Sequence, residues 1–119
     1  MRNVKELWDF PVKEGISFPD ANRVHPLMQE AVELVWKAAG KDGNLRKLIL
    51  FGSALEFRCD SYSDLDLYAE SMDPEMPLNF LPDLKCEVDL VTNLSHDSRL
   101  YREIDRTGLL LYERQQDNC

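Results

Sequence analysis

Three aspartates and a Gly-Ser pair are the residues of this chain whose types and spacing could do chemistry. An apolar run ends at Gly52-Ser53, ten residues separate Ser53 from Asp64-Leu65-Asp66, and Asp89 stands inside a later apolar run. Side chains in a β-strand alternate between two faces, so Asp64 and Asp66 share one face. If the strand that carries Asp89 lies beside theirs, three carboxylates meet on that face.

This combination of residues is suited to binding a metal ion and phosphates. Three carboxylates on one face repel and raise each other's pKa, and a divalent cation reverses that cost. Mg²⁺ fits best, because it binds a few carboxylates, several waters and substrate phosphates. At a strand-to-helix turn, Gly52 lets a phosphate approach the backbone, and the helix N-terminus offers free N–H groups. The Ser53 hydroxyl can add one more donor.

Apolar runs and periodicity predict the elements that would position these residues. The expected elements are a helix at 25–39, a strand at 45–51, a short helix at 53–57, strands at 64–69 and 83–91, a helix with Ser95 as its N-cap that ends near Thr107, and a strand at 109–112. The strand at 45–51 is continuously apolar from Leu48, as is typical of a central strand. The Gly-Ser turn thus directly follows this strand, and the acids lie on the next two.

Three further polar residues are possible members of the site. Glu70 continues the face of Asp66, but we expect it at the solvated end of its strand. Glu87 shares a face with Asp89 by the same period of two, which makes it a second-rank candidate for the acid cluster. Arg58 could reach a phosphate, or it could pair with a neighbouring surface carboxylate.

Two segments show no clear periodicity. Residues 71–82 contain three prolines, and a short helix packed on the sheet is favoured over a lid or a partner-binding loop. Residues 1–23 form an N-terminal extension in which Trp8 and Phe10 could dock onto a partner. Packing of both rings against the core of the same chain is the favoured interpretation.

The motif also carries a resemblance to a known family. Gly52-Ser53, the ten-residue spacing to Asp64-Leu65-Asp66, and Asp89 between apolar residues resemble the DNA polymerase β nucleotidyltransferase superfamily. The resemblance is greatest to its minimal nucleotidyltransferases, which are often paired with HEPN-type proteins in toxin–antitoxin modules. It covers residues 44–113, and residues 101–113 resemble the closing helix and strand of such proteins. It implies an α/β (α+β) nucleotidyltransferase fold, with a mixed sheet of about four strands and helices mainly on one face.

The resemblance further implies the roles of the site residues. It implies a metal site for two Mg²⁺ ions formed by Asp64, Asp66 and Asp89. It implies a nucleotide site formed by Gly52, Ser53, Ser63 and Arg58. In this interpretation Asp89 also helps to deprotonate the acceptor hydroxyl. The expected reaction is transfer of AMP from ATP, or of another nucleoside monophosphate from its triphosphate.

The acceptor has more than one candidate. The resemblance implies an antitoxin that adenylylates a hydroxyl on a HEPN-type partner protein. An alternative is transfer to a small molecule, as in the aminoglycoside-modifying members of the superfamily. Those enzymes need a second domain that binds the substrate, and 119 residues leave no room for one. A homo-oligomer could supply the missing wall of the substrate site. Another alternative is an inactive module that only masks its partner. Many minimal members carry Arg soon after the Gly-Ser pair, whereas this chain has Ala54-Leu55-Glu56.

Composition bounds these interpretations. The length predicts one domain, at 24–113, with a polar tail at 114–119. The formal net charge of −8 disfavours nonspecific nucleic-acid binding and suits a basic partner. Three cysteines without metal-ligand spacing indicate no disulfide framework or zinc site. No signal peptide or membrane span is recognisable, so we expect a cytoplasmic protein.

Overall fold

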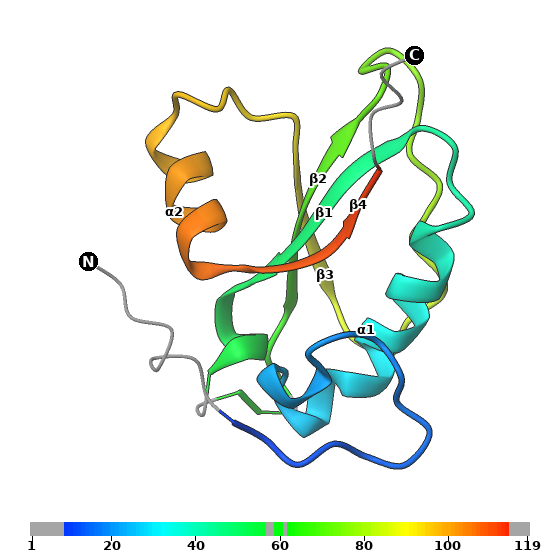
Figure 1. The fold of residues 1–119 in the computed structure, drawn as a ribbon, viewed down its shortest axis with the longest axis vertical. Helices are drawn as coiled ribbons and strands as arrows, with labels where there is room; N and C mark the ends of the chain where they lie inside the picture. Colours follow the sequence, from blue (N-terminus) through cyan, green and yellow to red (C-terminus); the bar gives the residue numbers. More distant parts are fainter. Residues whose placement is uncertain (1–8, 57–58, 61, 115–119) are drawn as a thin grey trace.

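The computed structural model describes residues 9–56, 59–60 and 62–114, and Figure 1 shows their fold. The main elements are helices α1 (Pro26–Ala39) and α2 (Arg99–Thr107), and strands β1 (Leu45–Phe51), β2 (Leu65–Ser71), β3 (Val88–Thr92) and β4 (Leu109–Glu113). Two short 3₁₀ segments are η2 (Ala21–Arg23) and η3 (Gly52–Leu55). The protein is thus an α+β fold, as its sequence predicts.

The four strands form one mixed sheet in the order β3-β2-β1-β4. Strand β1 is antiparallel to both β2 and β4, and β2 is parallel to β3. The predicted bounds of β1 are confirmed, and its central position explains its continuous apolar run. Leu48 and Leu50 are fully buried in the core on one face, and Ile49 is buried in the core on the other.

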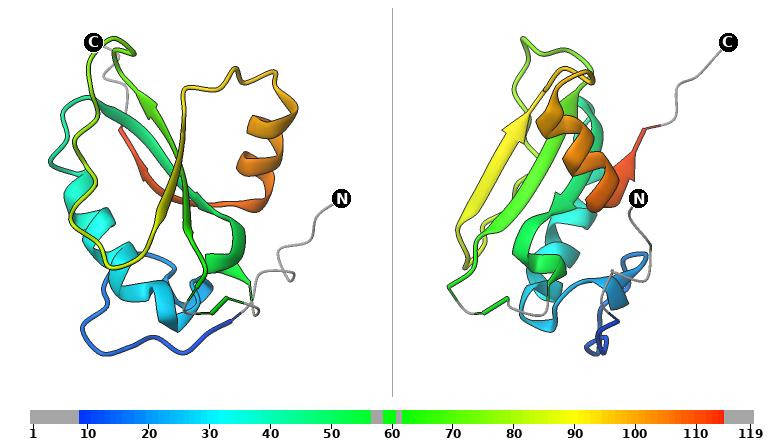
Figure 2. Two further views of the ribbon diagram at one scale, coloured as in Figure 1. Left: turned by 180° about the vertical axis from the view of Figure 1, so that it is seen from behind. Right: turned by 90° about the vertical axis from the view of Figure 1, so that its left-hand side faces the viewer.

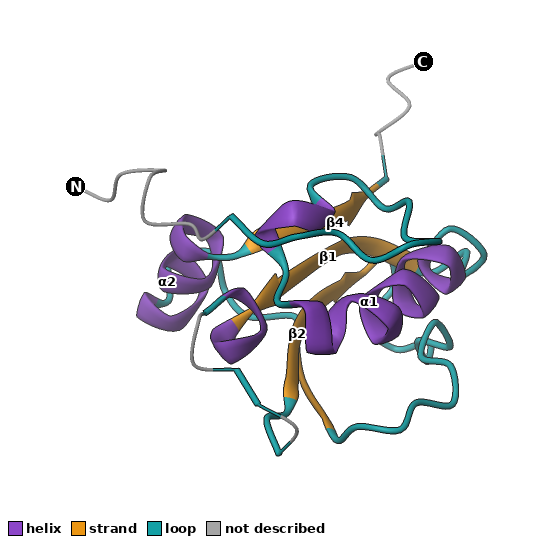
Figure 3. Ribbon diagram, turned by 90° about the horizontal axis from the view of Figure 1, so that it is seen from below, coloured by secondary structure: helices purple, strands orange, loops and turns teal. Residues whose placement is uncertain are grey.

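The two helices cover opposite faces of the sheet, as Figures 2 and 3 show. The larger core lies under α1 and also takes in buried residues of η2 and η3. The smaller core lies under α2, where Tyr101 and Ile104 pack against Ile49 and Tyr68. Most helical segments therefore lie on the α1 face, and α2 covers part of the other. The predicted range of the first helix is confirmed to within one residue, with His25 as the N-cap.

The parallel connection from β2 to β3 contains no helix, so the short helix predicted at 71–82 is wrong. Residues 72–87 cross the α1 face as an irregular segment. Phe80 is buried in the larger core. Because the segment is not helical, side chains satisfy part of its backbone. Asp42 Oδ2 accepts a hydrogen bond from the backbone N–H of Asn79 at 2.6 Å. Asn44 donates its side-chain amide to the carbonyl oxygens of Asp73 and Met76. These contacts hold the segment against the end of the sheet.

The prediction that Ser95 caps α2 is wrong, because the helix begins one turn later. The N-cap is Ser98, whose hydroxyl accepts a hydrogen bond from the Tyr101 N–H at 3.1 Å. Ser95 accepts a bond from Asp97 N–H instead and stabilises a turn before the helix. The predicted end of the helix near Thr107 and the final strand that follows it are confirmed.

The segment before α1 packs closely against that helix. Phe10 is buried, which confirms the prediction that its ring packs against its own chain. Gln29 accepts a bond from Lys13 N–H and donates to Pro11 O, while the Glu33 carboxylate accepts from the backbone of residues 17 and 18. Trp8 lies outside the described residues. Within the described ranges, α1 and α2 are both too short or too polar to cross a membrane.

Candidate functional site

Asp66 and Asp89 face each other across the parallel pair of β2 and β3. They are register partners, and the alternation of side chains puts both on the α2 face of the sheet. Asp66 is half-buried, and Asp89 is exposed. Neither carboxylate forms a hydrogen bond or an ion pair within the described part of the chain. The pairing of two of the three predicted acids is therefore a property of the folded sheet.

Gly52 brings the turn after β1 directly against this pair. Its φ of +82° lies in the left-handed region, which L side chains rarely adopt. A β-carbon at this position would lie 2.1 Å from Asp66 Oδ2, so only glycine leaves room for the carboxylate. The contact follows from the register, because Phe51, the residue before Gly52, pairs with Asp66. The structure thus joins the Gly-Ser turn to the acid pair.

The turn itself differs from the prediction. Instead of an α-helix at 53–57, residues Gly52–Leu55 form one 3₁₀ turn, with Ser53 half-buried within it. Ala54 and Leu55 point into the larger core. Arg58, a predicted phosphate contact, lies outside the described residues. Of the side chains in this turn, Ser53 alone carries a polar group that could contact a phosphate.

Asp64 lies immediately before β2 rather than within it, and its side chain is exposed. It is close enough to act on Asp66 electrostatically. Burial raises the pKa of Asp66 above its ordinary value, and the carboxylates of Asp89 and Asp64 raise it further. The three predicted acids therefore form one electrostatic group around Asp66, the most buried of them.

The donor chemistry of this group fits Mg²⁺, although the described residues contain no set of three acids, histidines or cysteines arranged to hold an ion unaided. Mg²⁺ requires only one or two carboxylates when waters and substrate phosphates complete its shell. Asp66 and Asp89 present such oxygens, and repulsion from Asp89 and Asp64 adds to burial in raising the pKa of Asp66. Binding of a cation together with a triphosphate would remove this repulsion.

A scan against models of known protein families finds no match to this chain, and no curated protein matches its sequence significantly.

Two other predicted candidates, Glu87 and Ser63, lie just outside β3 and β2. Glu87 precedes β3 and is exposed, and its backbone carbonyl accepts from Leu65 N–H. The strand predicted at 83–91 begins at Val88 instead, so Glu87 lies just before it, and its membership of the acid cluster stays a prediction. The Ser63 hydroxyl stabilises a turn, in which it accepts from Asp60 N–H at 3.0 Å and donates to Asp60 Oδ1 at 3.2 Å.

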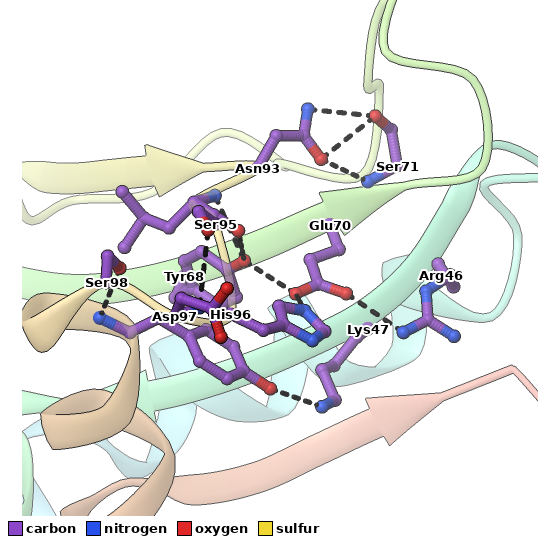
Figure 4. Close-up of polar contacts among 12 residues, drawn as sticks. Arg46, Lys47, Tyr68, Glu70, Ser71, Asn93, Ser95, His96, Asp97 and Ser98 are labelled. Carbon is purple, nitrogen blue, oxygen red and sulfur yellow. Dashed lines mark hydrogen bonds and ion pairs between the residues drawn. The ribbon is translucent and has the colours of Figure 1, made fainter.

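A polar network further along the α2 face was not predicted, and Figure 4 shows it. Glu70 was expected at a solvated strand end, but its side chain is buried. The carboxylate accepts hydrogen bonds from Tyr68 Oη at 2.6 Å and Arg46 at 3.1 Å, and it pairs closely with His96 Nε2. Burial alone would raise the pKa of Glu70, but these partners outweigh it and lower the pKa.

The network ties the sheet to α2 and to the segment before it. The His96 ring stacks on Tyr101 with 4.1 Å between ring centres, and Lys47 donates to Tyr101 Oη at 2.9 Å. Tyr68 Oη also accepts from Leu94 N–H at 3.2 Å. The sequence did contain a signal for this network, because Tyr68 and Glu70 lie on the same face of the strand as Asp66 by the period of two. What the sequence did not reveal is that α2 and its preceding segment cover this end of β2.

Proposed function

We propose that this protein is a Mg²⁺-dependent nucleotidyltransferase that transfers AMP from ATP to a hydroxyl group on a partner protein. The observation that carries the proposal is the contact of Gly52 with the Asp66 carboxylate, beside Asp89 on the neighbouring strand. It places a glycine turn, where a phosphate can approach the backbone, next to two carboxylates that could hold a cation. Phosphate and metal ion are the two requirements of nucleotidyl transfer.

Each residue of the site has a distinct role in this proposal. Mg²⁺, when bound, would neutralise the charge that develops on the triphosphate during transfer. Asp66 and Asp89 would hold it, with Asp64 contributing negative charge from the start of β2. Ser53 would donate its hydroxyl to a phosphate oxygen. Asp89, as an exposed carboxylate, would accept the proton of the attacking hydroxyl, whose oxygen bonds to the α-phosphorus as the bond to the β-phosphate breaks and pyrophosphate leaves.

A protein acceptor is supported by the openness of the acid face. Asp64 and Asp89 are exposed, and Asp66 between them is half-buried. Orientation of the attacking hydroxyl and exclusion of water contribute much of the rate, and a docked partner would supply both. The resemblance to minimal nucleotidyltransferases favours a HEPN-type protein as that partner. We expect this reaction to take place in the cytoplasm, where ATP and Mg²⁺ are abundant.

A module that binds and masks its partner without catalysis is the second candidate. The observation that favours it is the burial of Ala54 and Leu55, which leaves the 3₁₀ turn without a basic side chain for the phosphates. In this case the acid face would serve as a negatively charged docking surface. The two functions differ in whether the partner is covalently changed.

Mass spectrometry of the partner separates the two functions. The protein is incubated with ATP, Mg²⁺ and a purified HEPN-type protein as the candidate partner. Transfer predicts that the partner gains the mass of AMP with the wild type and with the control Asp105→Asn, but not with Asp64→Asn/Asp66→Asn. A partner that is bound and silenced equally by all three proteins, with no change in mass, would reject catalysis and leave masking.

A further inference from the structure

A pocket of about 630 Å³ lies on the α1 side of the sheet, on the face opposite α2. Its walls come from four parts of the chain that are distant in sequence. They are the loop at residues 14–16, one face of α1, the residues Asp60 and Ser63, and the segment at 83–86. Figure 3 shows α1 on the side of the sheet away from α2. The proposed nucleotide site does not use this pocket.

The floor of the pocket is an apolar stripe on α1. Leu27, Ala31 and Leu34 line it and are spaced at i, i+4 and i+7, so they lie on one face of the helix. Leu27 and Leu34 are 53% and 48% exposed, although they belong to a helix whose other face is buried in the core. The stripe extends for about 10 Å along the helix. This length and spacing match the contact made by an amphipathic helix lying in a groove.

The rim of the pocket is acidic. Glu14, Glu30, Asp60 and Asp83 line it, against one lysine, Lys85. Glu14 and Glu30 have no hydrogen bond or ion pair to any residue in the described ranges. Glu33 also borders the pocket, but its charge is balanced by Lys37 at 3.3 Å and by bonds from the loop at residues 17–18. An occupant must therefore combine an apolar face with positive charge.

We infer that this groove docks a helical segment of a partner protein that carries aliphatic side chains at i, i+4 and i+7 and is flanked by Lys or Arg. Charge selects this occupant over a second copy of the chain, because two acidic rims on chains of net charge −8 would repel. Binding at the groove is independent of catalysis. Ser63 lies in its wall, but the groove is on the face of the sheet opposite the acid pair.

The test uses designed peptides of about 16 residues, a length that can form a helix on binding. The first peptide places Leu at i, i+4 and i+7 with Lys at the flanking positions. The second has the same composition in scrambled order, and the third replaces every Lys by Glu. Binding is measured by fluorescence anisotropy at low and at high salt. The first peptide should bind at least about tenfold tighter than either control, and more weakly at high salt.

Matched variants locate the binding site. Leu34→Gln should weaken binding of the first peptide about tenfold, because one buried leucine is lost. Leu100→Gln should leave it unchanged, since Leu100 is equally exposed, at 49%, but lies on α2. Glu30→Gln should weaken binding and reduce its salt dependence. Circular dichroism confirms that each exposed-site variant remains folded.

Three outcomes would overturn the inference. If the scrambled peptide binds equally well, binding is only nonspecific attraction between a basic peptide and an acidic protein. Equal loss in Leu34→Gln and Leu100→Gln would place the contact elsewhere. A wild-type dimer that dissociates in Leu34→Gln during sedimentation would assign the groove to self-association. None of these outcomes depends on whether the acid pair is catalytic.

Discussion

Gly52 lies against the carboxylate of Asp66, so closely that a β-carbon on Gly52 would come within 2.1 Å of Asp66 Oδ2. Gly52→Ala should therefore impose two costs, a left-handed backbone of about 1–2 kcal/mol and a steric displacement of Asp66 of about 1–3 kcal/mol. Gly15→Ala is the matched control, because its φ is +87° and nothing lies within 4 Å of the added carbon. Urea denaturation should show that the Gly52 variant is the less stable. Equal losses of unfolding free energy in the two variants would mean that the close approach of Gly52 to Asp66 does not affect stability.

The raised pKa of Asp66 makes its replacement harmless or stabilising in the absence of metal. A carboxyl group that binds its proton more tightly in the folded state loses stability when it ionises. This cost is absent below its ordinary pKa of 3.8 and complete above the folded-state pKa. The free energy of unfolding of Asp66→Asn, relative to wild type, should thus increase as pH rises from acid to neutral. The comparison is made without metal. If the difference in free energy of unfolding between Asp66→Asn and wild type instead decreases as pH rises, this prediction is wrong.

Mg²⁺ with ATP should stabilise the wild-type protein through the acid pair. At about 100 times the dissociation constant the gain is about 2.7 kcal/mol, on the order of 10 °C in melting temperature for a domain of this size. Asp66→Asn should abolish the shift, and Asp105→Asn, an exposed aspartate on α2, should keep it. Differential scanning fluorimetry measures all three. A full shift in Asp66→Asn would remove Asp66 from the metal site.

The Ser53 hydroxyl should contribute to nucleotide binding but not to folding. Ser53 is half-buried in the 3₁₀ turn beside Gly52, where its hydroxyl can donate to a charged phosphate. Loss of such a bond costs roughly 1.5–3 kcal/mol, so Ser53→Ala should weaken ATP binding about tenfold or more at an unchanged melting temperature. Isothermal titration calorimetry in the presence of Mg²⁺ checks this. Equal affinity in both proteins would exclude the hydroxyl from the nucleotide site.

Glu70 should be important for stability rather than for catalysis. Its folded-state pKa is lowered because its hydrogen-bond partners outweigh burial, so its ionised form stabilises the protein at neutral pH. Glu70→Gln should cost about 1–3 kcal/mol at neutral pH. The difference from wild type should begin to shrink below the ordinary pKa of 4.5 and disappear as pH falls through the folded-state value.

Glu113→Gln is the control for this effect. The Glu113 carboxylate is 45% exposed and lies 3.9 Å from Lys47 Nζ, so its removal should cost less than about 1 kcal/mol. Denaturation from neutral pH to about pH 3 compares the three proteins. Similar losses in the two variants would mean that burial of Glu70 in its network adds nothing.

The sequence alone predicted the central strand, the first helix and the Gly-Ser turn. These are determined locally, because a continuous apolar run marks β1 and a 3.6-residue apolar period marks α1. The same local rules put Asp66 and the residues that follow it at spacings of two on one face of β2. The chemistry of the acid face could therefore be anticipated from residue types and spacing.

Only the tertiary structure decided which side chains meet. Asp89 lies opposite Asp66 because β3 pairs in parallel with β2, and β3 begins at Val88 because its partner strand begins at Leu65. Residues 83–87 lie before β3, and the carbonyl of Glu87 accepts from Leu65 N–H at the start of β2. Glu70 is buried because α2 and the segment before it, distant in sequence, pack over the end of β2. Local propensity cannot determine such pairings, since they depend on register and on contacts between segments far apart in the chain.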